Sequence, residues 1–317
     1  MKFSFVAAAL AILPFAWASP VDVSAHLFKR ASTSDAATTG YATGTTGGNG
    51  GSTVTVTTLA ALTSAVTGDT ATIVLVSGTI TGNVVVKIGS NKSVIGKAGA
   101  SLVGVGLRVL DESNVIIRNL KISKVLAAAG DAIGIQASSK VWVDHVDLSS
   151  DRDHDKDYYD GLLDITHGCF GITVSYSVLH DHWKTSLVGH SDDNGAEDVA
   201  IRVTYHHNYW YNLSSRLPSF RFGQGHIYNN YYLNSDDGIN TRDGAQLLIQ
   251  NNVFSGIDKP IYATDVGYAV AQGNDLGGGT NTAPVGTLTT VPYSYSLDAV
   301  TAVKANVVGV AGATLAF

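Results

Sequence analysis

A short apolar strand that ends in Asn, His or Tyr recurs along the second half of this chain. Taking these end residues as equivalent gives the series Asn119, His145, Tyr176, Asn208, Asn230 and Asn252. Successive members lie 26, 31, 32, 22 and 22 residues apart, which indicates a basal period of 22 with insertions. A period of this length is typical of a coiled parallel sheet, in which each coil buries its apolar face by stacking on its neighbours.

The repeat predicts an all-β fold, a single-domain right-handed parallel β-helix over residues 53–317. Only 15% of the residues are charged and 34 are glycine, a composition that suits short strands and tight turns better than long surface helices. An antiparallel sandwich would explain the strands but not the recurrence of Asn at one phase of the repeat. We expect a short capping helix over 57–66, and projecting loops in the long intervals that flank Tyr176, where binding sites tend to lie.

The N-terminus has the pattern of a secretory signal. Lys2 precedes an apolar run over 3–15, and residues 16–18 form an A-x-A cleavage motif. The apolar run is too short to span a bilayer, so we expect no membrane partner. These features predict a signal peptide over 1–18 and a secreted, extracellular protein.

Two further segments are expected before the β-helix. The dibasic pair Lys29-Arg30 resembles a processing site and predicts a pro-segment over 19–30. The Gly-, Ser- and Thr-rich residues 31–52 are expected to form a flexible leader.

Charge and cysteine content narrow the partners. A net charge of −6 argues against a nucleic-acid binder, which would carry a basic stripe, and we expect a monomer. Cys169 is the single cysteine, so no intramolecular disulfide forms, and we interpret it as a small buried side chain rather than a nucleophile. Asn91 and Asn212 begin sequons that secretion would expose to glycosylation.

Five segments carry the side chains suited to chemistry. They are GDAI at 130–133, WVDH at 142–145, DGLLDI at 160–165, HDHWK at 180–184 and RLPSFRFG at 216–223. Asp160 and Asp164 stand four residues apart, where a strand-to-turn segment can aim both outward. With Asp131 about one coil away, they predict an oxygen-lined hollow of the kind that hard cations such as Ca²⁺ prefer.

In this order and spacing, the five segments resemble the pectate lyases of polysaccharide lyase family 1, in their extracellular fungal form. The resemblance covers nearly all of the chain after residue 30. It implies a parallel β-helix that uses Ca²⁺ to cleave polygalacturonate, the acidic polymer of plant cell-wall pectin, by β-elimination.

The resemblance also assigns roles to single residues. It implies that Asp131, Asp160 and Asp164 are the calcium ligands. Some family members have Glu at the position of Asp160, and others have an extra Asp where this chain has Ala129. The second difference predicts a weaker calcium site, or one that relies more on ligands from the substrate.

The basic residues have implied roles too. Arg216 matches the Brønsted base of the family, and Lys184 and Arg221 match its substrate-carboxylate binders. Arginine is normally protonated, so the base role demands neighbouring cations and predicts an alkaline optimum. The sequence leaves open whether the Leu217–Pro218 bond is cis.

Other side chains admit two readings. We interpret His145 as a buried network residue rather than a general base, and Trp142 as a packing residue rather than a sugar platform. The polar run over 151–157 is expected to be a solvated loop, and a second metal there is the alternative.

Three rival functions remain to be tested. A pectin lyase would share the fold but act on methyl-esterified chains without calcium. A polygalacturonase would hydrolyse with paired aspartates, for which Asp236-Asp237 is the nearest match. A non-catalytic pectin-binding β-helix predicts loss of a catalytic residue, whereas all six implied residues are present.

Overall fold

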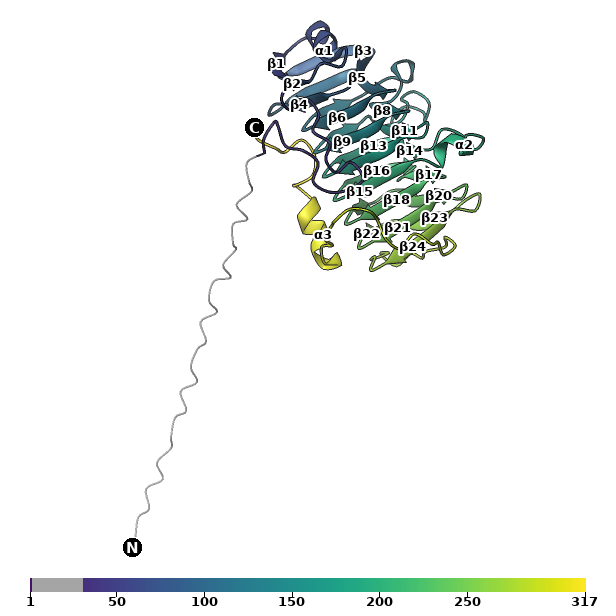
Figure 1. Cartoon of the computed structure of the whole chain (residues 1–317). Helices are drawn as coiled ribbons and strands as arrows, with labels where there is room; N and C mark the ends of the chain where they lie inside the picture. The colour runs from purple at the N-terminus through teal and green to yellow at the C-terminus, as the bar shows by residue number, and fades with distance from the viewer. Residues whose placement is uncertain (2–30) are drawn as a thin grey trace.

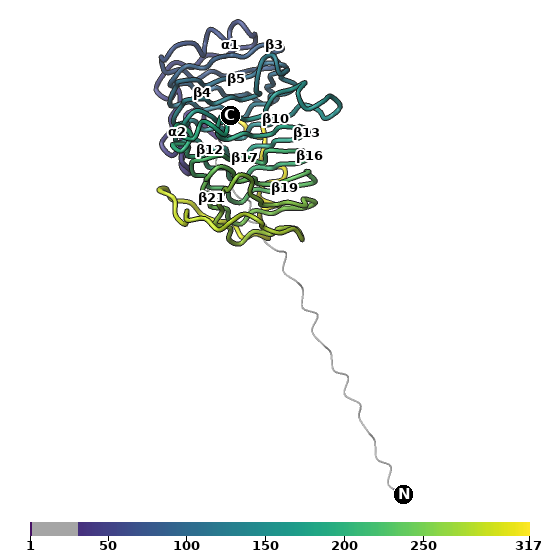
Figure 2. Tube along the Cα trace, turned by 90° about the vertical axis from the view of Figure 1, so that its right-hand side faces the viewer, coloured from purple at the N-terminus to yellow at the C-terminus, as the bar shows by residue number. Residues whose placement is uncertain are grey.

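The computed structural model describes residue 1 and residues 31–317. Over the range 52–272 the chain winds into a parallel β-helix whose strands stack coil upon coil (Figure 1), which confirms the predicted fold class. Figure 2 shows the stacked coils after a turn of 90°. The signal peptide and pro-segment predicted for 1–30 lie outside the described residues, apart from the first methionine.

The first sheet contains ten strands, one from each coil. They are β1 Ser52–Val56, β2 Thr72–Val76, β4 Lys92–Gly96, β6 Ser113–Arg118, β9 Ser139–Asp144, β12 Phe170–Ser175, β15 Arg202–His206, β18 Gln224–Tyr228, β21 Gln246–Gln250 and β24 Tyr268–Gln272.

The second sheet continues around the other faces of the helix, because the long strand β5 pairs with β7 along its first half and with β8 along its second half. Its strands are β3 Thr79–Ile88, β5 Ser101–Leu110, β7 Lys121–Ser123, β8 Ile133–Gln136, β10 Asp147–Ser149, β11 Leu163–Thr166, β13 Val178–Lys184, β14 Leu187–Val188, β16 Tyr209–Ser215, β17 Ser219–Arg221, β19 Tyr231–Leu233, β20 Ile239–Arg242, β22 Val253–Ser255 and β23 Ile261–Ala263.

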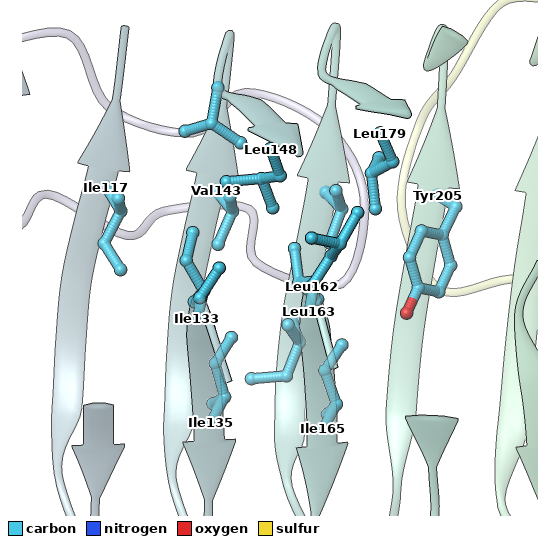
Figure 3. Close-up of a cluster of buried hydrophobic side chains, with 14 of the residues drawn as sticks. Ile117, Ile133, Ile135, Val143, Leu148, Leu162, Leu163, Ile165, Leu179 and Tyr205 are labelled. Carbon is cyan, nitrogen blue, oxygen red and sulfur yellow. The ribbon is translucent and has the colours of Figure 1, made fainter. Parts of the chain in front are cut away.

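The core is a column of aliphatic side chains inside the coils (Figure 3). Ile133 and Ile135 of β8 pair in register with Leu163 and Ile165 of β11, and all four are fully buried. Successive strand residues point to opposite faces, so Asp164, between Leu163 and Ile165, points out of the core. The same alternation that builds the core therefore places a carboxylate on the outer surface.

An asparagine ladder runs through four consecutive coils at Asn208, Asn230, Asn252 and Asn274. Each Nδ2 donates to the Oδ1 of the next asparagine, at 2.9, 2.9 and 3.0 Å. The backbone N–H of each of the first three also donates to the next Oδ1, at 2.9 Å in every case. Side chains that would be costly to bury unpaired are thus bonded along the axis.

The predicted equivalence of residues along the repeat is wrong by one position. The backbone N–H of Ser177 donates to Asn208 Oδ1, so the ladder position in that coil is Ser177 and not Tyr176. The members that share one phase are Asn119, His145, Tyr176, His207, Asn229 and Asn251, which all have φ between 44° and 55°. The prediction failed because the turn holds two adjacent polar residues. The backbone of the first is left-handed, and the side chain of the second is directed inward.

The two ends of the chain cover the β-helix. Helix α1, Leu59–Val66, confirms the predicted short helix near the N-terminal end of the β-helix, with a start two residues later than expected. The Thr58 side chain caps the first turn of this helix. The other helical segments are η1 Ala127–Ala129, α2 Gly195–Asp198 and α3 Val300–Val307. No helix in the described part of the chain is long and apolar enough to cross a bilayer.

The segment 31–51 differs from the flexible leader that its composition predicts. Its Ala37 and Ala42 are buried against Ile116 and Trp142 of the first sheet. The Ala42 N–H donates to Thr173 Oγ1 at 2.9 Å. Small residues let this segment lie close to the outer face of the sheet, so the composition reflects close packing rather than mobility.

Candidate functional site

The six residues assigned from the sequence lie on neighbouring coils of the second sheet, and we call them the cation–carboxylate site. Their positions follow from the strands: Asp131 precedes β8, Asp160 precedes β11, Asp164 lies on β11, Lys184 ends β13, Arg216 lies between β16 and β17, and Arg221 ends β17. Because β8, β11, β14 and β17 are successive neighbours in the sheet, the fold brings residues 90 positions apart in sequence onto one outer surface.

Gly161 marks where two of the carboxylates converge. A Cβ placed on this glycine would lie 2.5 Å from Asp164 Oδ1 and 2.8 Å from Asp131 Oδ1, so a larger residue would push both carboxylates from these positions. The Gly161 N–H donates to Asp131 Oδ1 at 2.9 Å, and the Leu187 N–H donates to Asp164 Oδ1 at 2.9 Å. The glycine thus opens a hollow lined by carboxylate oxygens.

The electrostatics of this hollow disfavour two negative charges. Burial, with the like charge of Asp160, raises the pKa of Asp131 to about 6. Burial and the neighbouring Asp131 raise the pKa of Asp164 well above its ordinary value. Both shifts have the sign expected where burial and the like charge of a neighbouring carboxylate outweigh the attraction of nearby arginines.

Asp160 does not share the hollow directly. Its Oδ1 lies 3.3 Å from Lys184 Nζ, so its carboxylate faces the lysine. Accordingly, residues 31–317 contain no preassembled group of three acidic, His or Cys side chains with metal geometry. Two converging carboxylates with a third beside them still fit Ca²⁺, which takes many oxygen ligands in flexible geometry and accepts some from water or substrate.

Arg216 lies over this carboxylate pair. Its Nη1 is 3.8 Å from Asp164 Oδ2, and its side chain is 30% exposed. The residue has φ of 66°, a left-handed backbone that is uncommon outside glycine, and the Ser186 N–H donates to its carbonyl oxygen at 2.8 Å. The Leu217–Pro218 bond that follows is cis. The guanidinium is therefore aimed from a fixed turn toward the hollow.

Two further arginines lie at this surface, and the sequence motifs do not include either of them. Arg242 pairs in register with Arg221 across β17 and β20, one coil and 21 residues further along the chain, so the 22-residue period points to within one position of it. Arg108 lies beside Asp131, since a Cβ on Gly134 would be 3.2 Å from Asp131 Oδ2 and 3.6 Å from Arg108 Nε. Nothing in the local sequence around Arg108 indicates this position.

A pocket of about 670 Å³ lies elsewhere, between residues 35–39, residues 294–296 and the first sheet. There His145 Nδ1 bonds Asp144 Oδ2 at 2.8 Å, while Arg118 Nε and Ser175 Oγ bond the same carboxylate at 2.7 and 2.6 Å. The Asp144 carboxylate is thus already paired with side chains of this chain. We therefore assign the chemistry to the cation–carboxylate site instead. His145 belongs to this hydrogen-bond network, which lies on the first sheet and away from the cation–carboxylate site, so His145 does not orient that site.

The polar run over 151–157 forms a loop whose first carboxylate is already engaged. Asp151 Oδ1 bonds His154 Nδ1 at 2.7 Å, and its Oδ2 accepts from the Tyr159 hydroxyl at 2.8 Å. These bonds favour the reading of a structured loop over that of a second metal site. Cys169 is fully buried, and burial raises the pKa of its thiol to about 12, in agreement with a structural role.

Comparison with known proteins gives the family. A family model described as pectate lyase matches residues 5–315. Pectate lyase A of Aspergillus niger is 59% identical over 318 residues, with 98% of each chain covered. Pectate lyase B of Colletotrichum gloeosporioides is 58% identical over 295 residues, covering 91% of this chain and 89% of its own.

Solved structures agree. A pectate lyase from Bacillus sp. N165, crystallised in complex with trigalacturonate, superimposes with a TM-score of 0.78 at 31% identity, covering 86% of this chain and 98% of its own. Pectate lyase II from Xanthomonas campestris gives a TM-score of 0.75 at 28% identity, covering 87% and 98%. The chain belongs to the pectate lyase family of polysaccharide lyases.

Proposed function

We propose that this enzyme cleaves polygalacturonate by calcium-dependent β-elimination at the cation–carboxylate site. The observation that carries the proposal is the position of the Arg216 guanidinium, 3.8 Å from one of two converging buried carboxylates. A cation bound by those carboxylates and a base beside it are the two elements that the reaction needs.

The site suits a polyanion although the chain itself is acidic. Lys184 and Arg221 supply positive charge on either side of Arg216, and Arg242 adds a third cation next to Arg221. Arginine grips a carboxylate through several N–H donors, and lysine acts as a compact charge. The trigalacturonate complex of the Bacillus relative supports an acidic oligosaccharide as the ligand class.

The residues of the chain divide the reaction between them. Lys184 and Arg221 hold uronate carboxylates and so fix the sugar rings. Arg216 accepts the proton from C5, the electron pair of that C–H bond forms the C4=C5 double bond, and the C4–O4 glycosidic bond breaks with protonation of the leaving oxygen. Ca²⁺ held by Asp131, Asp160 and Asp164 would withdraw charge from the uronate carboxylate and make the C5 proton more acidic.

The product tests the proposal. Elimination conjugates a new double bond to the carboxylate, so incubation with polygalacturonate at alkaline pH should raise the ultraviolet absorbance, and excess chelator should abolish the rise. A rise that ignores chelator would favour a pectin lyase. Reducing ends without absorbance would favour a polygalacturonase, and neither signal from a folded sample would leave a pectin-binding protein.

Further properties are proposed from the sequence alone. We infer that the protein is secreted, is a monomer and acts on plant cell-wall pectin. We also infer N-glycosylation at Asn91 or Asn212. The Asn212 side chain is exposed, and Asn91 is half-buried with its Nδ2 bonded to Asp69 O at 3.1 Å. The Asn212 Nδ2 also donates, to Asp181 Oδ1, so greater exposure alone favours Asn212 as the acceptor. Mass spectrometry of the secreted protein would show which sequon is used.

A further inference from the structure

Both cations assigned to substrate carboxylates already hold a carboxylate of this chain. Lys184 Nζ lies 3.2 Å from Asp157 Oδ1, and Arg221 Nε lies 2.5 Å from Asp192 Oδ1. The two aspartates come from loops on different coils, one between β10 and β11 and the other between β14 and α2. In Figure 1, α2 stands out from the side of the β-helix beside β14 and β17.

The partners in each pair differ in burial. The Lys184 side chain is 17% exposed and that of Asp157 is 71% exposed. The Arg221 side chain is 13% exposed and that of Asp192 is 60% exposed. A mostly buried cation is costly to leave without an anion, whereas an ion pair to a solvated carboxylate contributes little to stability. Each cation also has a second carboxylate, since Asp160 Oδ1 lies 3.3 Å from Lys184 Nζ and Asp243 Oδ2 lies 3.5 Å from Arg221 Nε. The exposed aspartate can therefore leave without stripping its cation of every anionic partner.

The Arg221 pair is also incomplete. Among residues 31–317, the buried Nη1 of Arg221 has no hydrogen-bond partner. Asp192 reaches the guanidinium through Nε and is shared with Arg242 Nη2 at 3.2 Å. An incoming carboxylate could engage the free Nη1 as well, which would favour it over Asp192.

We propose that Asp157 and Asp192 are stand-ins for two uronate carboxylates. They hold Lys184 and Arg221 while the site is free and give way when polygalacturonate binds, an inference that rests on the proposed function. A neutral methyl ester cannot take over the charge of a displaced aspartate. The ester therefore leaves both ion pairs in place, and the stand-ins lower the affinity for acidic chains alone.

Neighbouring aspartates provide matched controls. Asp153 and Asp193 are exposed, lie on the same two loops, and form no ion pair with any described residue. Changing them to Asn removes the same charge from the same surface without freeing a cation. The comparison of D157N with D153N, and of D192N with D193N, thus isolates the displaced pair from general electrostatics.

The test is calorimetric binding of trigalacturonate in chelator, where neither cleavage nor metal contributes. We expect D157N and D192N to bind about two- to fivefold more tightly than D153N and D193N. The gain should be absent for the trimethyl ester of trigalacturonate. Unfolding midpoints in urea should match the wild type, since all four side chains are exposed.

Three results would overturn the inference: affinities equal to those of the controls, weaker binding by D157N and D192N, or an equal gain for the ester. Weaker binding would mean that the aspartates position the cations for substrate. Failure of the proposed function is separate, because it would appear as a wild-type enzyme that forms no unsaturated product. A wild type that forms the product, with variants that behave as their controls, would reject only the stand-ins.

Discussion

The asparagine ladder and the cation–carboxylate site are both built from polar side chains on stacked coils, but they differ in what completes them. Each buried ladder asparagine bonds to other groups of this chain, as Asn230 does to Asn208, Asn252 and two carbonyl oxygens. The site instead holds two buried carboxylates with raised pKa values and a buried Arg221 Nη1 without a partner among the described residues. The ladder stabilises the fold, and the site is arranged for ligands that the chain does not supply.

Arg216→Ala should have the largest effect of the variants that test this difference. Loss of the proposed base should lower kcat about 100- to 10,000-fold, the usual range for a general base. The free energy of unfolding should change little, because the nearest carboxylate is 3.8 Å away and the side chain is partly exposed. Initial rates from ultraviolet absorbance and a urea titration measure both, and a variant that keeps a tenth of the rate would exclude Arg216 as the base.

Asn230→Ala should do the opposite. It removes the acceptor of two Asn208 donors and the donor to the carbonyl oxygens of Tyr205 and Tyr228 in the interior, which should lower the free energy of unfolding by about 3 kcal/mol. The rate per folded molecule should be unchanged. Asn49→Ala, which removes the same atoms from an exposed side chain, is the control and should be neutral. Equal stabilities for the two variants would contradict the role of the ladder.

The free energy of unfolding should depend on pH in opposite directions at His226, which is buried in the β-helix, and at Asp131 in the site. Burial lowers the pKa of His226, on β18, from 6.5 to about 4, so between these values the unfolded state binds more protons than the folded state. Stability contributed by His226 is present above pH 6.5 and is lost as the pH falls toward 4, by about 2 kcal/mol. Urea midpoints of wild type and His226→Gln from pH 7 to pH 4 measure this, and parallel curves would contradict it.

The repeat predicted the fold because stacked coils leave a direct trace in sequence. It could not fix the phase, because the turn carries two adjacent polar residues, and only the hydrogen bonds separate Tyr176 from Ser177. The prediction of a flexible leader over 31–52 failed for a related reason. Small polar residues allow close packing on a sheet as well as flexibility.

The site was predictable only where its residues fall within motifs. Asp131, Asp160, Asp164, Lys184, Arg216 and Arg221 come to one surface from four of the five segments. The fifth, WVDH at 142–145, lies on the first sheet and does not join them. Arg108 is separated from Asp131 by a whole turn of chain, so only the register of β5 with β8 reveals it. The loop partners Asp157 and Asp192 lie in segments without periodicity, where side-chain contacts cannot be read from spacing.

We propose that the buried carboxylates of the site destabilise the free protein and that a bound cation makes them favourable. Between pH 3.8 and about 6 the folded state binds more protons at Asp131 than the unfolded state, so this residue costs stability as the pH rises through that window. Asp131→Asn should therefore raise the free energy of unfolding in chelator at pH 8, by about 1 kcal/mol.

The deciding measurement is the urea midpoint of wild type and Asp131→Asn at pH 8, with chelator and then with Ca²⁺. The account predicts that the variant is the more stable protein in chelator, and that Ca²⁺ stabilises the wild type but not the variant. A variant less stable than the wild type in chelator, or a wild type indifferent to Ca²⁺, would contradict it.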